Sequence, residues 1–164
     1  MTGTLVLGIG NTLLSDEGVG VEVVHFLRNH CTIPAGVSLL DGGTLSFTLT
    51  ETIQRHDNLV VVDAAQLGAP AGTVCCFEDE AMDEFLGNCK RSAHEVGLLD
   101  LMDIARLTDS LPRHRALVAI QPGSIDWGTE PTAAVGAAIP EAASQVEKLL
   151  HRWQQAAEPQ EACA

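Results

Sequence analysis

The chain of 164 residues lacks any apolar run long enough to span a bilayer, and its start lacks the basic flank and cleavage site of a signal peptide. We therefore expect a soluble protein of the cytoplasm. Basic residues are also scarce: 9 Lys and Arg stand against 22 Asp and Glu, giving a net charge of −13. Because nucleic acids and anionic membranes repel such a surface, neither is expected as a partner, whereas a metal cation or a basic peptide is.

The five cysteines show neither a Cys-x-x-Cys spacing nor the even number of a disulfide framework. Without a secretory signal, they are expected to be reduced thiols. Cys75 and Cys76 lie in a strand-like run, where neighbouring side chains point to opposite faces. Packing in the core therefore explains this pair better than a shared metal ion does.

Three common signatures of nucleotide or catalytic sites are missing. Gly8 and Gly10 begin a dinucleotide fingerprint, but Leu13 stands where its third glycine belongs, and no strand ends in an acid about twenty residues later. The Gly-x-Ser-x-Gly elbow of hydrolases is absent. His94-Glu95 is not followed by the second histidine of a zinc-protease motif. A nucleotide-binding module therefore remains only a weak alternative.

Strand-like and helix-like patterns alternate along the chain. Strands are predicted at 4–9, 37–40, 58–63, 73–77 and 117–120. Helices are predicted at 17–30, 44–55, 92–111 and 131–156, the third opened by a capping box at Ser92 and Glu95. Residues 78–88 are interpreted as a polar connection, and Pro140 is expected to kink or divide the last helix.

This alternation predicts one α/β domain over residues 1–157, a three-layer sandwich built on a mostly parallel sheet. Residues 158–164 are predicted to form a disordered tail. In such a sheet, ligands bind at the carboxyl ends of the strands. Acidic residues follow three predicted strands: Asp16 and Glu17 the first, Asp41 the second and Asp63 the third.

The turn after the first strand is acidic where a phosphate-binding turn would present bare amides to an anion. Glu17 and Asp63, together with His94 at the start of a helix, suit a divalent cation such as nickel or zinc, with coordination positions left open. Simpler roles stay open for each: Asp16 as an N-cap, Asp41 as a turn residue, Glu17 as a partner of the helix dipole and His94 as a surface residue near a cap.

Four strings occur in order: GIGNTLLSDEGVG at residues 8–20, DGGT at 41–44, VDA at 62–64 and HEVGL at 94–98. Together they closely resemble the hydrogenase maturation endopeptidases, which process the large subunit of nickel–iron hydrogenases. The resemblance covers residues 4 to 150. It implies a five-stranded twisted sheet with helices on both faces, and an enzyme that removes a C-terminal extension from the precursor after nickel insertion.

On the matching motifs, the metal ligands of that family fall on Glu17, Asp63 and His94. The resemblance implies that nickel arrives with the precursor, so that no permanently bound cofactor is expected. Glu95 stands where the family often has glutamine. The metal would polarise the scissile carbonyl, activate water or position the peptide. Asp41, flanked by glycines, is the candidate for an auxiliary catalytic role in peptide positioning or proton transfer.

A second function stays open, because a nickel-binding assembly chaperone would need the same three ligands without proteolysis. A monomer is expected. The sequence does not specify which hydrogenase is processed or where the precursor is cut.

Overall fold

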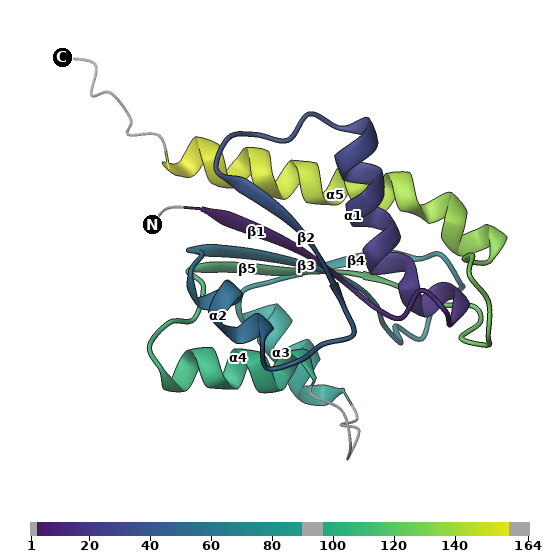
Figure 1. Cartoon of the computed structure of the whole chain (residues 1–164), viewed down its shortest axis with the longest axis horizontal. Helices are drawn as coiled ribbons and strands as arrows, with labels where there is room; N and C mark the ends of the chain where they lie inside the picture. The colour runs from purple at the N-terminus through teal and green to yellow at the C-terminus, as the bar shows by residue number, and fades with distance from the viewer. Residues whose placement is uncertain (1–2, 90–96, 158–164) are drawn as a thin grey trace.

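Five strands form one sheet in the computed structural model, which describes residues 3–89 and 97–157 (Figure 1). The strands are β1 (Thr4–Ile9), β2 (Val37–Gly43), β3 (Asn58–Ala64), β4 (Val74–Glu78) and β5 (His114–Ile120). Their order is β2-β1-β3-β5-β4, and only β4 runs antiparallel to its neighbour. The edge at which β1, β2, β3 and β5 end is called the carboxyl edge below.

Helices cover both faces of the sheet (Figure 1). The helices α1 (Val19–His30) and α5 (Ala133–Ala157) pack on one face, and α2 (Leu49–Gln54), α3 (Glu80–Asn88) and α4 (Leu98–Leu107) pack on the other. A single 3₁₀ turn, η1 (Ser15–Gly18), precedes α1. The predicted three-layer α/β fold is therefore confirmed. Within the described residues, no helix combines the length and the apolar character needed to cross a bilayer.

The central strands are apolar throughout because both of their faces are covered by helices. Along β3, Val60 and Val62 pack against α1 and α5, whereas Leu59 and Val61 pack against the three helices of the other face. This alternation also fixes the face onto which a polar residue at a strand end points.

Two predicted elements differ in the structure. The second helix begins at Leu49 instead of residue 44, because the amides of Leu49 and Thr50 bond back to Ser46 and Phe47 in a turn that follows Gly43. The stretch interpreted as a polar connection is the helix α3, which buries Met82 and Leu86. The acidic residues between this i, i+4 pair conceal its apolar stripe.

The helices α4 and α5 also differ from their predicted forms. The capping box at Ser92 lies outside the described residues, and α4 itself begins after Gly97, whose amide donates to the Asp100 carboxylate at 2.8 Å. Pro140 does not divide α5, which continues for 25 residues. Buried residues on both sides of the proline, Ala138 and Ala142, hold α5 on the sheet and offset the roughly 3 kcal/mol that an interior proline costs.

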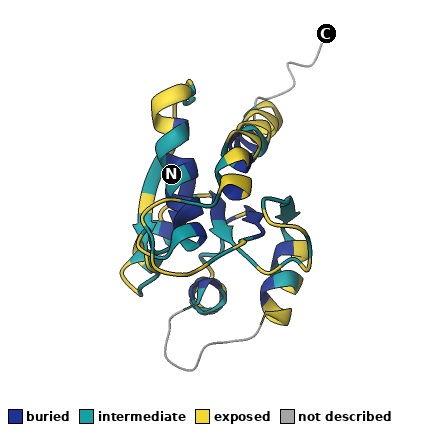
Figure 2. Cartoon of the chain, turned by 90° about the vertical axis from the view of Figure 1, so that its right-hand side faces the viewer, coloured by how far each residue is buried: buried dark blue, intermediate teal, exposed yellow. Residues whose placement is uncertain are grey.

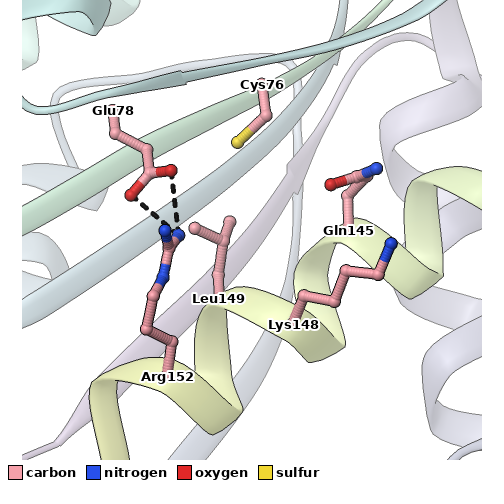
Figure 3. Close-up of a pocket in the computed structure, with 6 residues that line it drawn as sticks. All are labelled: Cys76, Glu78, Gln145, Lys148, Leu149 and Arg152. Carbon is pink, nitrogen blue, oxygen red and sulfur yellow. Dashed lines mark hydrogen bonds and ion pairs between the residues drawn. The ribbon is translucent and has the colours of Figure 1, made fainter. Parts of the chain in front are cut away.

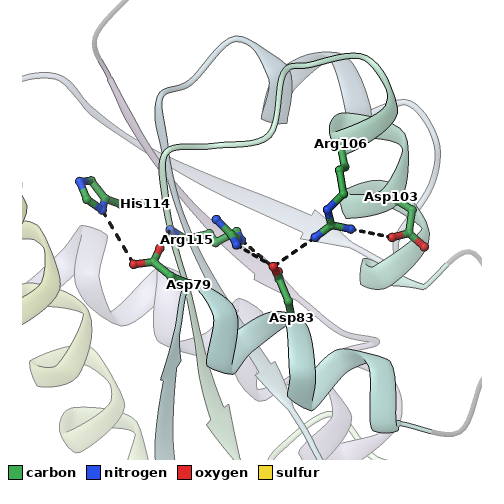
Figure 4. A network of polar contacts seen from close by, with 6 residues as sticks. All are labelled: Asp79, Asp83, Asp103, Arg106, His114 and Arg115. Carbon is green, nitrogen blue, oxygen red and sulfur yellow. Dashed lines mark hydrogen bonds and ion pairs between the residues drawn. The ribbon is translucent and has the colours of Figure 1, made fainter.

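An ion-pair network ties α3 and α4 to the start of β5 (Figure 4). The buried Arg115 donates two hydrogen bonds to Asp83, at 2.6 and 3.0 Å, and Arg106 bridges Asp83 and Asp103. The bond from Arg115 holds the pKa of Asp83 below its ordinary value. These contacts fix the first turn of α3 and the last turn of α4 at the end of the sheet remote from the carboxyl edge.

Candidate metal-binding site at the carboxyl edge

Glu17 and Asp63 come together at the carboxyl edge. Glu17 lies in η1, five residues after the end of β1, and Asp63 is the penultimate residue of β3; both residues are half-buried. Burial, with a further contribution from the charge of Glu17, raises the pKa of Asp63 well above its ordinary value, although the amide of Ala64 partly opposes this. A desolvated carboxylate with a second carboxylate close enough to raise its pKa is an arrangement that a cation would stabilise.

Two glycines of the first motif bring this pair together. A Cβ on Gly10, whose φ is +142°, would lie 1.8 Å from the carbonyl oxygen of Glu17. A Cβ on Gly20 would lie 2.1 Å from the carbonyl oxygen of Val62, the residue before Asp63. Side chains at these positions would push η1 and α1 away from the sheet, so the glycines set how closely Glu17 approaches Asp63.

His94 lies outside the described residues, so the structure does not test it as the third ligand. Cys89, which follows α3, is the last described residue before the segment of His94. The pKa of the Cys89 thiol is raised by partial burial and by the charge of Asp63. Within residues 3–89 and 97–157, no three His, Cys, Asp or Glu side chains are grouped so that they could hold a metal ion.

Asp41 points to the other face of the sheet. Its carboxylate lies 3.4 Å from Nε2 of His25 on α1 and accepts a 2.9 Å hydrogen bond from the amide of Gly43. Asp63 shares the face of Val61, against α2, α3 and α4. Asp41 and Asp63 are also two strands apart, about 10 Å at the usual strand spacing. The structure thus brings Glu17 to Asp63 but does not bring Asp41 to them.

Asp16 has a role that sequence reasoning missed. It caps neither η1 nor α1. Its fully buried carboxylate instead accepts hydrogen bonds from the amides of Gly123, Ser124 and Thr132 and from the Thr132 hydroxyl, at 2.6 to 2.9 Å. Burial alone would raise the pKa of Asp16, but these four bonds hold it below its ordinary value. Asp16 therefore fastens η1 to the loop that leads into α5.

Cys76 lies on β4, facing α5 beside a pocket of about 290 Å³ (Figure 3). Burial and the charge of Glu78 raise the pKa of the Cys76 thiol to about 11. Glu78 itself pairs with Arg152 through two hydrogen bonds, at 2.8 and 2.9 Å. Because the thiolate is the nucleophile, a thiol with this pKa is inert at neutral pH.

If the chain has the peptidase activity that the sequence motifs predict, Cys76→Ala should therefore leave its rate unchanged within about twofold, with a loss of about 1 kcal/mol in the free energy of unfolding. Cys75→Ala should behave in the same way. Cleavage rates of a natural protein substrate and urea unfolding curves, measured on both variants, provide the check. Complete loss of cleavage in a folded Cys76→Ala protein would reopen a thiol mechanism.

Comparisons with known proteins identify relatives of the whole domain. A family model described as hydrogenase maturation protease (HycI) matches residues 21–149. The Hydrogenase 2 maturation protease of Escherichia coli is 36% identical over 160 residues, which cover 96% of each chain. The solved structure of the hydrogenase maturating endopeptidase HybD from E. coli superimposes with a TM-score of 0.84 at 34% identity, covering 92% of this chain and 93% of that chain.

The hydrogenase expression/formation protein HupD of Thiocapsa roseopersicina is 41% identical over 122 residues. That match covers 74% of this chain but only 55% of HupD, so the chain spans about half the length of this relative.

Proposed function

Because this chain belongs to the hydrogenase maturation protease family, we propose that it is an endopeptidase that removes the C-terminal extension of a nickel–iron hydrogenase large-subunit precursor after nickel insertion. The observation that carries the proposal is the approach of Glu17 to Asp63 at the carboxyl edge, where burial and mutual repulsion raise the pKa of Asp63. Both residues lie in the motifs that resemble those of the family. The site as a whole is built to receive a positive charge.

In this proposal the protein holds no metal of its own, and the nickel already carried by the precursor is part of the substrate. Glu17, Asp63 and His94 bind that nickel through the positions that the precursor leaves open. Two carboxylates and one imidazole suit a borderline-hard divalent ion. The metal supplies Lewis acidity near the scissile bond, and the three side chains orient the precursor. Specificity then comes from binding the loaded precursor more tightly than the empty one.

Protons compete with nickel for these ligands. Because the raised pKa of Asp63 favours its protonated form, nickel must displace that proton, and acid should suppress the reaction at a pH above the ordinary range for a carboxylate. Asp41 is proposed as an auxiliary residue that positions the peptide. It does so from the face of the sheet that α1 covers, opposite to the face of Asp63. The protein is further proposed to act as one domain in the cytoplasm, where its four described cysteines, all free thiols, would stay reduced.

The test compares three substrates: nickel-loaded precursor, nickel-free precursor and the isolated peptide that spans the cleavage site. We expect cleavage of the loaded precursor to be about 100-fold faster, or more, than that of the other two. Mass spectrometry of the released extension measures the rates. Efficient cleavage of nickel-free precursor in the presence of a chelator would contradict nickel recognition.

The alternative, a nickel-binding assembly chaperone, gives a different result in the same experiment. A chaperone would bind the loaded precursor, or accept its nickel, and leave the extension intact. Intact precursor after prolonged incubation with a folded, binding-competent protein would therefore favour the chaperone.

A further inference from the structure

Large apolar side chains are exposed mainly at the carboxyl edge. Among the described residues, Leu13, Phe47, Ile125 and Trp127 lie in loops at this edge and are at least half exposed, and Trp127 is 82% exposed. The other such residue, Leu107, ends α4 near the opposite edge of the sheet. Figure 2 looks onto the carboxyl edge and shows its loops as exposed or half-buried. Exposed tryptophan adjoining a binding site is a frequent mark of a protein interface.

Leu13, Ile125 and Trp127, called the docking patch below, stand on two loops that are bonded together. The amide of Gly128 donates to the carbonyl of Leu13, and the amide of Ser15 donates to the carbonyl of Gly128, each at 2.9 Å. The Ser15 hydroxyl bonds the carbonyl of Asp126 at 2.8 Å. With the buried Asp16 carboxylate, these contacts hold the backbone of both loops. The patch is therefore ordered before a partner arrives, which lowers the entropy cost of binding.

The described residues around the patch include carboxylates but no Lys or Arg. Residues 10–18, 41–49, 63–73 and 121–134, which form the described part of the carboxyl edge, contain no Lys or Arg. They contain six carboxylates: Asp16, Glu17, Asp41, Asp63, Asp126 and Glu130. The described basic residues lie on α1, α4 and α5 or near the starts of β3 and β5. A partner that covers the patch must therefore tolerate negative charge around an apolar centre.

We propose that the docking patch binds the folded body of the large-subunit precursor, at a surface where an apolar protrusion is ringed by Lys and Arg. This inference rests on the proposed function and adds a second point of recognition to it. Ser15, which bonds the loop of Ile125 and Trp127, is only two residues from Glu17. The patch therefore adjoins the proposed metal-binding site. A precursor seated on the patch presents its nickel to Glu17 and Asp63. The patch recognises the protein, and the carboxylates recognise the metal.

The charge around the patch argues against two other occupants. Two copies of this chain joined through their patches would bring together two surfaces whose described residues include carboxylates and no Lys or Arg, and such surfaces repel each other. An anionic membrane is repelled for the same reason. A basic protein surface is attracted, and complementary charge of this kind favours both the rate and the orientation of docking.

The experiment compares Trp127→Ser with Leu107→Ser, which removes an equally exposed apolar side chain remote from the site. On nickel-loaded precursor, Trp127→Ser should raise KM about tenfold or more with kcat nearly unchanged, as expected for an interface anchor. Leu107→Ser should leave both constants within about twofold. Leu13→Ser tests the patch independently, and Trp127→Phe should restore most of the affinity. Equal effects of Trp127→Ser and Leu107→Ser, or a fall in kcat alone, would overturn the proposal.

A binding measurement separates the patch from the proposed function. Trp153 is buried, so acrylamide quenching of the free protein reports mainly on Trp127. In mixtures, the same measurement on Trp127→Phe gives the contribution of Trp153 and of the precursor's own tryptophans, which is subtracted. Nickel-free precursor should protect Trp127 from acrylamide, because docking on the patch does not need the metal. Protection without any cleavage of loaded precursor would support docking while contradicting the endopeptidase. The docking proposal would be overturned if neither the nickel-free nor the nickel-loaded precursor protected Trp127. It would also be overturned if Trp127 were already protected by association of two copies of this chain.

Discussion

Asp63→Asn should abolish precursor processing and at the same time make the free protein more stable at neutral pH. The loss of processing, expected to exceed about 100-fold, follows from the proposed role of Asp63 as a charged ligand for the nickel of the precursor. The gain in stability follows from the pKa. Because the pKa of Asp63 is raised in the folded state, the folded protein binds this proton more tightly than the unfolded chain does. The free energy of unfolding then falls as the pH rises from the unfolded pKa through the folded pKa.

Above its unfolded pKa, Asp63 therefore lowers the stability of the fold, because ionising it in the folded state costs desolvation and repulsion with Glu17 that asparagine does not incur. Urea unfolding at pH 7 should show a higher midpoint for Asp63→Asn than for the natural protein. The difference should shrink as the pH is lowered and Asp63 takes up its proton. Asp57→Asn is the matched control, because Asp57 is exposed and precedes the other end of β3. A clear loss of stability in Asp63→Asn would mean that Asp63 is held by favourable contacts.

Asp16→Asn should have the opposite effect on stability. Its carboxylate accepts four hydrogen bonds, three of them from backbone amides on a remote loop. In asparagine an NH₂ group replaces one of the two carboxylate oxygens, and an NH₂ group cannot accept a hydrogen bond. The donors that face it would be left buried and without a partner. We expect a loss on the order of 3 kcal/mol, the usual cost of breaking buried bonds to a charged group. Processing should also fall, because the same bonds hold η1 and Glu17.

The pH dependence of this loss has a definite sign. The pKa of Asp16 is lowered in the folded state, so the ionised carboxylate contributes stability that is fully present above its unfolded pKa, near the ordinary value of 3.8. That contribution is lost as the pH falls through the folded pKa. The gap between the natural protein and Asp16→Asn should thus be constant from pH 7 to 5 and shrink below about pH 4.

Urea unfolding at several pH values measures this gap, and Asp126→Asn provides the control. Asp126 lies in the loop that Asp16 holds, but it is exposed, so its change should cost less than about 0.5 kcal/mol. Equal unfolding midpoints for Asp16→Asn and the natural protein would show that the loop is held mainly by its other contacts.

The sequence predicts features that depend on a local pattern of residues or on the order of the strands. The apolar run of β1 is bounded as predicted, at residues 4 and 9, because a strand buried on both faces is apolar throughout and ends abruptly at a glycine turn. The approach of Glu17 to Asp63 also follows from sequence, since β1 and β3 are parallel neighbours that end at the same edge. The third proposed ligand, His94, stays a prediction from the motif.

Other features depend on contacts that no local pattern reveals. The partners of Asp16 lie 107 to 116 residues away in the sequence, so nothing near Asp16 distinguishes it from an N-cap. Asp41 lies inside β2, which continues to Gly43 beyond the predicted strand end at residue 40, and its place in the alternation of β2 turns it toward α1 and His25. The sequence shows at which edge of the sheet a strand end lies. Assigning a side chain at that edge to one face of the sheet requires the register of the strand as well.

The close packing at Gly10 and Gly20 has a consequence for the thermodynamics of binding. The contacts at Gly10 and Gly20 fix how closely the main chains of η1 and α1 approach the end of β3. If Glu17 and Asp63 bind the nickel of a precursor as proposed, the backbone segments that carry them do not have to be ordered on binding. That part of the entropy cost would be met when the chain folds, not when the cation arrives.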